Sequence, residues 1–422
     1  ASNVIRGGAE AYIQTSDVAT TTSGDVSVTA TNNMVIDATA TNAVTSTASA
    51  SEAVGVTLAF NTIGWAAQNI LFSAIDALLG DPALADDAFD GNEGAHATAR
   101  MTDTLISAVG LAAFTAVSTN SITSTVRNTT TASATKKGSE AKGLGLVLSL
   151  NKVSSATQAY IEYTDPVDVN NVDIDADNGV LVSADDHAQI TADVDLKNSA
   201  GGSPDATGVS GAVSLNDVRG GAQATVTNAN ILSTGFNTDD TKAGDVVVEA
   251  TERASITSTI ASEMVANAKA KGKTGNTTTS VGGQNGNSTP SSMAVSGIIA
   301  TNLVLSDALA SVTGSKIVTA DTDADEGNVT VSASNTSTIT ASTTNTATAS
   351  GGADTDAIGI TLAFNTVGYE AQNILFNAVD TLLGDDLISD AISAAPGAGA
   401  TASVFDTLID ASGQLSVEAT MD

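Results

Sequence analysis

Two acidic stretches of the sequence have the residue types and spacing of a metal site. Each has the form D-x-D-x-D-x-G and stands just before a Val strand, with the acids at Asp173, Asp175 and Asp177 and at Asp321, Asp323 and Asp325. Alternate carboxylates near a Gly turn can converge on a hard cation through oxygen ligands. The pattern therefore predicts calcium, although it lacks the Gly and Glu positions of an EF-hand. The alternative is a solvated acidic turn on an acidic protein.

The other reactive residue types are too scattered to predict catalysis. The chain has two His and no Cys, whereas a zinc site needs three or four convergent ligands. His96 and His187 lie in different repeats without a shared motif. Near Lys271 the sequence is similar to a phosphate-binding loop, but Asn267 takes the place of the first Gly. A polysaccharide-active enzyme with a carboxylate pair is the third function considered, and we expect no enzyme.

Composition limits the classes of partner. The formal net charge is −32, from 47 acidic and 15 basic residues, and nucleic acid binding needs clustered Lys and Arg. We therefore expect no nucleic acid partner. No apolar run approaches the ~20 residues of a membrane-spanning helix, so no membrane span is predicted. The chain starts at Ala1 with neither an initiator Met nor a signal peptide, and we expect a processed product or a window of something longer.

One long stretch of the sequence occurs twice. The segment AVGVTLAFNTIGW, from Ala53, returns as AIGITLAFNTVGY from Ala357. A looser motif, in which an apolar run leads to an Asn, recurs along the chain at Asn3, Asn61, Asn151, Asn216, Asn302 and Asn365. Long and short intervals alternate, which indicates a super-repeat of two units. Such self-similarity is typical of solenoids, in which each repeat buries its apolar face against the next.

Strand patterns fill these intervals. Gly, a polar residue and alternating Val recur, as in GDVSVTA at Gly24 and GDVVVEA at Gly244. Such alternation predicts strands with one buried face, separated by turn formers such as the Asn pair at Asn32 and SGG at Ser350. Aromatics are only 3%, which favours a narrow core of small aliphatic residues. We predict an all-β, right-handed parallel β-helix (β-solenoid) of short strands, continuous over residues 1–422.

The six recurrent Asn admit two structural roles. An inward Asn at a turn of stacked coils can hydrogen-bond to its equivalents above and below, which satisfies polar groups that are costly to bury. Alternatively, Asn is used because it tolerates a left-handed turn conformation. In both cases the six are structural turn residues.

Helical periodicity interrupts the strands at two places. Apolar residues at helical spacing predict short helical insertions near 66–80 and 370–384. In the repeats of Asn151 and Asn216, the segment after the Asn has a strand pattern, which begins after Ser155 and Arg219. We therefore expect that a helix replaces this strand in the two long copies. The helices either cover the apolar flank of the solenoid or mediate contacts between molecules. If the helices mediate contacts between molecules, we expect the contacting residues to be Ile70, Leu71, Ile374 and Leu375.

The recurring phrasing GxxLAxNxV, GDVxVxA and SGG resembles the repeat regions of giant bacterial surface and secreted proteins, such as long adhesins and filamentous-haemagglutinin-like passengers. The resemblance covers essentially the whole chain and implies a right-handed β-helix that serves as a stalk or fibre. We therefore expect an extracellular or cell-surface structural protein, a rod or filament component that assembles with itself. The alternative is an adhesin stalk that binds cells, surfaces or glycans.

Overall fold

The computed structural model describes residues 1–64, 95–136, 139–168, 170–202, 205–233, 244–269, 290–319, 326–351, 354–368 and 397–422. These residues form parallel strands stacked in three sheets, with no helix among them. The fold is therefore all-β, as predicted, and its parallel stacking is consistent with a β-solenoid. The predicted helices near 66–80 and 370–384 lie outside the described residues.

Sheet A has nine strands and contains the two copies of the repeated segment. Its strands are β1 (Ser2–Ile5), β2 (Gly8–Gln14), β5 (Ser51–Ile63), β6 (Ala95–Thr102), β9 (Ala141–Glu162), β12 (Ala206–Thr227), β15 (Ser291–Thr313), β18 (Asp354–Val367) and β19 (Gly399–Phe405). The two copies, in β5 and β18, are separated by β9, β12 and β15. They therefore occupy equivalent places near opposite edges of one sheet.

Sheets B and C have six strands each. Sheet B consists of β3 (Asp17–Ala19), β7 (Leu105–Ala108), β10 (Ile174–Ala176), β13 (Asn230–Ser233), β16 (Lys316–Thr319) and β20 (Leu408–Ala411). Sheet C consists of β4 (Val26–Ala48), β8 (Ala112–Ala134), β11 (Val180–Gly202), β14 (Val246–Ala268), β17 (Val329–Ser350) and β21 (Leu415–Met421). The chain passes through A, B and C in turn, and we call one such passage a rung.

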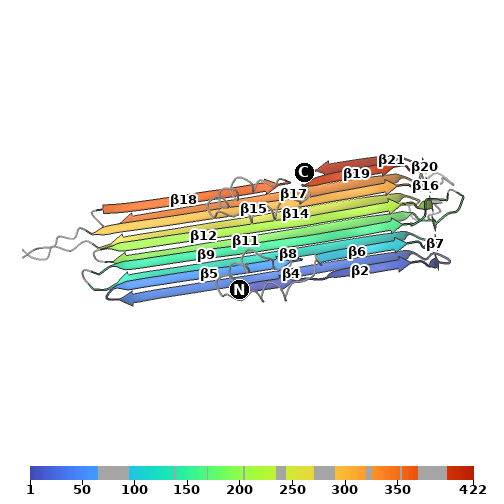
Figure 1. The fold of residues 1–422 in the computed structure, drawn as a ribbon. Coiled ribbons are helices and arrows are strands. Elements are labelled where there is room, and N and C mark those ends of the chain that lie inside the picture. Colours follow the sequence, from blue (N-terminus) through green and yellow to red (C-terminus); the bar gives the residue numbers. More distant parts are fainter. Residues whose placement is uncertain are drawn as a thin grey trace, which may run out of the picture.

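The strands are long, contrary to the prediction of short ones. Strand β8 has 23 residues and β9 has 22, which corresponds to about 75 Å at the usual rise per residue. Six rungs stacked about 4.8 Å apart span only about 25 Å. Figure 1 shows the consequence, because the molecule is longest along its strands. Asn32, predicted at a turn, instead lies within β4 because the inward and outward alternation continues through it.

The two interrupted copies retain their strands, which corrects the expectation of a helix in place of a strand. On β9, Val153 pairs with Ile63 and Ser155 pairs with Ala95. Strands β5 and β6 thus lie in line along β9, and residues 65–94 are inserted between them. Likewise β18 and β19 both pair with β15. The segment that follows the recurrent Asn therefore forms a strand in every rung, because the neighbouring strands need hydrogen bonds to its backbone.

The core lies between sheets A and C, and at one end buried residues of sheet B pack with residues of both. Inward residues are mostly Ala, Val and Ile, and Phe114 is the largest of the fully buried side chains among the described residues. Where A turns into B, five of the six rungs have a residue with a positive φ: Thr15, Asp103, Asn228, Gly314 and Asp406. Apart from Thr15, these are residue types that tolerate the left-handed region. A repeated turn of this kind keeps successive rungs in register.

Candidate functional site

The six recurrent Asn form one continuous column across sheet A. The Nδ2 of each donates to the Oδ1 of the next, at 2.8 Å from Asn3 to Asn61 and at 2.8 Å from Asn61 to Asn151. The remaining distances are 2.8, 2.8 and 2.7 Å, along Asn151, Asn216, Asn302 and Asn365. The central side chains are fully buried and also bond across the core, as when Asn61 Nδ2 donates to Ser124 Oγ at 3.1 Å.

These Asn lie within strands, which corrects their prediction as turn residues. None has a positive φ, so the left-handed turn role is wrong for them. Neighbouring Asn are 58, 90, 65, 86 and 63 residues apart and occupy adjacent rungs. Each interval is therefore one rung, and the 90-residue interval is long because it includes residues 65–94. The alternating intervals come from insertions.

The acids Asp173, Asp175 and Asp177 are not brought together as ligands. They alternate with the buried Ile174 and Ala176, so successive carboxylates are separated by about 6.6 Å along the chain. Asp173 Oδ2 accepts a hydrogen bond from the Asn230 N–H at 2.8 Å, and burial raises the pKa of Asp173. Within the described ranges no group of three or more His, Asp or Glu could hold a metal ion. The geometry gives no support to calcium here.

Other predicted sites fall outside the described part of the chain or on separate surfaces. Asp321, Asp323 and Asp325 lie outside it, as do the assembly contacts Ile70, Leu71, Ile374 and Leu375. His96 belongs to β6 of sheet A and His187 to β11 of sheet C. The two His thus belong to different sheets.

Two buried carboxylates form a site that the sequence motifs did not identify. Asp186 on β11 and Glu252 on β14 are directly paired in register, and both are 0% exposed. The Gly221 N–H of β12 donates to Asp186 Oδ2 at 3.3 Å, whereas neither oxygen of Glu252 has a hydrogen-bond partner among the residues that the structure describes. A Cβ on Gly220 would lie 2.5 Å from Glu252 Oε1, so the facing strand leaves the carboxylate room only because Gly stands there.

The environment of this pair favours protonated carboxyl groups. Burial raises the pKa of Asp186 to about 7. The pKa of Glu252 is also raised, first by burial and then by repulsion from Asp186. Because both are enclosed between the sheets, they cannot reach a polysaccharide as a catalytic pair would. The signal that could have found them is an acid at an inward position of a strand whose neighbouring inward residues are Val, Ala and Ile.

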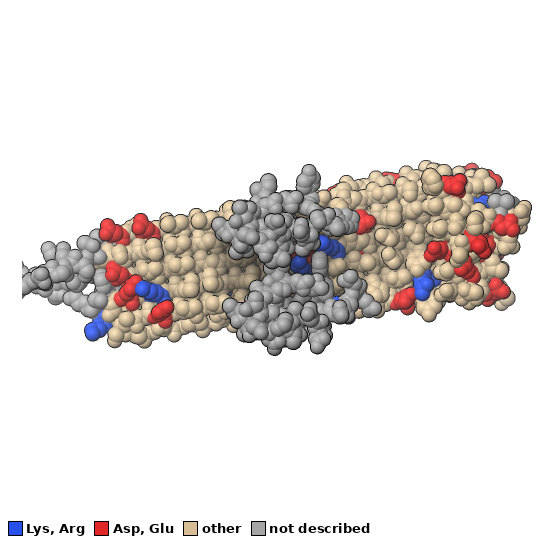
Figure 2. All heavy atoms as spheres, in the orientation of Figure 1, with Lys and Arg blue, Asp and Glu red and all other residues tan. Residues whose placement is uncertain are grey.

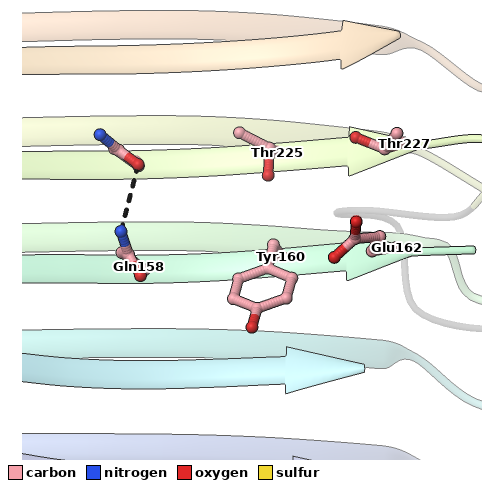
Figure 3. A pocket seen from close by; sticks show the side chains of 6 residues that line it. Gln158, Tyr160, Glu162, Thr225 and Thr227 are labelled. Atoms are coloured by element: carbon pink, nitrogen blue, oxygen red, sulfur yellow. Dashed lines mark hydrogen bonds between the residues drawn. The ribbon is translucent and has the colours of Figure 1, made fainter. Parts of the chain in front are cut away.

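A shallow polar hollow lies on the outer face of sheet A, near sheet B. It has a volume of about 310 Å³ and is lined by Gln158, Tyr160 and Glu162 of β9 and by Gln223, Thr225 and Thr227 of β12. Gln158 Nε2 donates to Gln223 Oε1 at 3.2 Å across the two strands. Figure 3 shows the Tyr160 ring extending from β9 away from β12. Arg100 of β6, which pairs in register with Tyr160, lies over the Tyr12 ring at 4.5 Å.

No protein-family model, curated protein or solved structure matches this chain. Among the described residues there is also no helix long and apolar enough to cross a membrane. The functional argument therefore depends on the geometry of the three sheets.

Proposed function

We propose that this chain is a structural protein, an elongated rod or fibre component whose rungs close into a right-handed β-helix. The observation that carries the proposal is the unbroken Asn column, which joins every rung by a side-chain hydrogen bond at the centre of the core. In such a ladder each buried Asn side chain needs hydrogen-bond partners on the neighbouring rungs, so the rungs hold together as one stack. The two buried carboxylates are inaccessible, so they add no reason to propose catalysis.

We further propose an extracellular or cell-surface location in a bacterium, as a segment of a giant surface protein. The support is the resemblance of the repeats together with an acidic chain that has no Cys. In this setting the stack grows perpendicular to its strands, by about 4.8 Å for each added rung.

Electron microscopy of the purified chain tests the structural function. We expect regular filaments, and diffraction from aligned filaments should show a repeat of about 4.8 Å along the axis. Charged substitutions at Ile374 and Leu375 should abolish the filaments while the β-rich circular dichroism persists, if those residues are assembly contacts. Monodisperse particles that never associate would argue against a fibre component.

A second candidate, glycan adhesion, is favoured by the polar hollow beside Tyr160. An aromatic ring and planar amide groups on one rigid sheet are suited to bind sugar hydroxyls and ring faces. A glycan array probed with the wild type and with Tyr160→Ala tests this candidate. Selective binding that is lost in the variant would support adhesion, and a blank array would reject it.

A further inference from the structure

One half of the outer face of sheet A carries a broad apolar surface. Residues at alternate positions of β5, β9, β12, β15 and β18 pair in register and form four columns of five. We call this the apolar face: Val54, Leu144, Val209, Val295 and Ile358; Val56, Leu146, Gly211, Gly297 and Ile360; Leu58, Leu148, Val213, Ile299 and Leu362; Phe60, Leu150, Leu215, Thr301 and Phe364. It contains no charged residue, although the chain carries 62 of them, 47 acidic and 15 basic.

The first three columns of the apolar face are open to solvent, whereas Phe60 and Thr301 in the fourth column are buried. Val56 is 48% exposed and Ile360 56%, and the more central Leu146 and Val213 are still 40% and 39% exposed. Figure 2 shows tan surface to the left of the centre, with Lys, Arg, Asp and Glu atoms gathered at its far left end. Exposed apolar surfaces of several hundred Å² are rare on monomers and mark interaction sites.

The shape of this surface suits another flat sheet. Its columns follow a regular lattice, about 4.8 Å between strands and about 6.6 Å along them. At Gly297 on β15 an added Cβ would meet nothing within 4 Å, whereas at Gly211 on β12 it would meet Leu146 Cδ2 at 3.1 Å, so the face has an open depression at Gly297. A protruding side chain of a partner fits such a depression when two sheets pack face to face about 10 Å apart.

We propose that the apolar face is a lateral interface that binds the same face of a second copy of this chain. This inference rests on the proposed structural function, because a fibre component assembles with copies of itself. The three exposed columns measure roughly 480 Å², so a face-to-face pair would bury about 1,000 Å² in total, the size of a weak interface. Aliphatic side chains dominate the face and Phe60 and Phe364 are its only rings, which favours another aliphatic sheet over a stacked sugar.

If the partner is a second copy, the charge of the chain predicts how the strength of pairing depends on the salt concentration. Two copies with a net charge of −32 each repel one another at low salt, whereas the buried surface itself is neutral. Added NaCl screens the repulsion and leaves the apolar contact intact, so pairing should strengthen. A cationic protein partner would show the opposite dependence.

Sedimentation equilibrium of the full chain, from low to high NaCl, tests the interface. We expect concentration-dependent pairing that salt strengthens and that Leu146→Glu with Val213→Glu weakens by at least 10-fold. The matched control is Thr257→Glu with Thr259→Glu, which adds the same charge to exposed positions of sheet C and should leave pairing unchanged. Pairing that survives the first variant, or that the control abolishes equally, would overturn the proposal, as would a wild type that remains monomeric throughout.

A crosslinking experiment guards against a variant that fails to fold. Because the chain has no Cys, Val213→Cys with a short bismaleimide should trap dimers, and Thr257→Cys should not. Equal trapping at both positions would overturn the interface. Binding of the chain to zwitterionic lipid vesicles, lost on Leu146→Glu with Val213→Glu, would replace the second copy by a lipid surface.

The same variants separate this inference from the proposed function. Filaments that persist when Leu146→Glu with Val213→Glu stops lateral pairing would support both. Wild-type dimers without any filament would support the interface and reject the fibre.

Discussion

Asn61 Nδ2 donates to Asn151 Oδ1 at 2.8 Å, although 90 residues of chain separate the two side chains. Thirty of those residues, 65–94, are inserted between β5 and β6 and leave the column undisturbed. The bond is fully buried, so each amide depends on the one above and the one below. This relationship connects the repeat in the sequence to the continuity of the stack.

Substitution of a central member of the column should therefore be costly. Asn216→Ala leaves Asn151 without its acceptor and Asn302 without its donor, and each unsatisfied buried group costs about 1–3 kcal/mol. We expect the free energy of unfolding to fall by about 2–5 kcal/mol, measured by urea denaturation. Gln189→Ala, at an exposed position of sheet C, is the control and should change stability by less than about 0.5 kcal/mol. Equal stability of the two variants would show that the Asn column does not contribute to stability.

The buried pair Asp186 and Glu252 should make the protein less stable as the pH rises. Both pKa values are raised in the folded state, so below about pH 7 the folded chain binds more protons than the unfolded chain. The contribution of the pair is complete below the ordinary carboxyl pKa and is lost as the pH rises toward about 7. Asp186→Asn with Glu252→Gln should flatten this dependence and increase stability at pH 8 by at least about 1 kcal/mol.

Thermal unfolding across pH 4–8 measures this effect. Neutralisation of two exposed acids of sheet C, in Asp37→Asn with Glu263→Gln, controls for the general repulsion in an acidic chain. We expect that control to keep the wild-type slope. A wild type whose stability rises between pH 5 and 7, relative to the double variant, would contradict the assignment.

Removal of residues 65–94 should leave the sheets intact. Ile63 and Ala95 pair with Val153 and Ser155, so Gly64 joined directly to Ala95 would stand opposite Ser154 in one continuous strand. We expect unchanged β-rich circular dichroism and a Tm within a few degrees of the wild type. Loss of the β signal would show that the insertion is required for folding.

Phe114 should be the most sensitive single position of the core. Its column contains Val28 and Val182 on the neighbouring strands, so the packing at this rung has adapted to one larger ring. Phe114→Ala should destabilise the chain by about 3–5 kcal/mol because it leaves a cavity, as measured by denaturant unfolding. The same deletion at the exposed Phe405 should cost less than about 1 kcal/mol.

The stacking of strands in this chain can be predicted from the sequence alone. Alternation of Val and small polar residues predicts one inward face because side chains alternate across a strand. The recurrent Asn identify one equivalent residue in every rung, and they can be recognised without knowledge of the strand bounds. These signals are local or periodic, so they survive without knowledge of the pairing.

In contrast, the positions of the turns and the contacts between distant side chains become visible only in the folded chain. The alternation continues through Asn32 as it does elsewhere, so strand length could not be inferred from it. The pairing of Asp186 with Glu252 and the apolar face across five strands depend on register between residues some 60 to 90 positions apart. Register is set by every pair along neighbouring strands at once, and no short stretch of sequence carries that information.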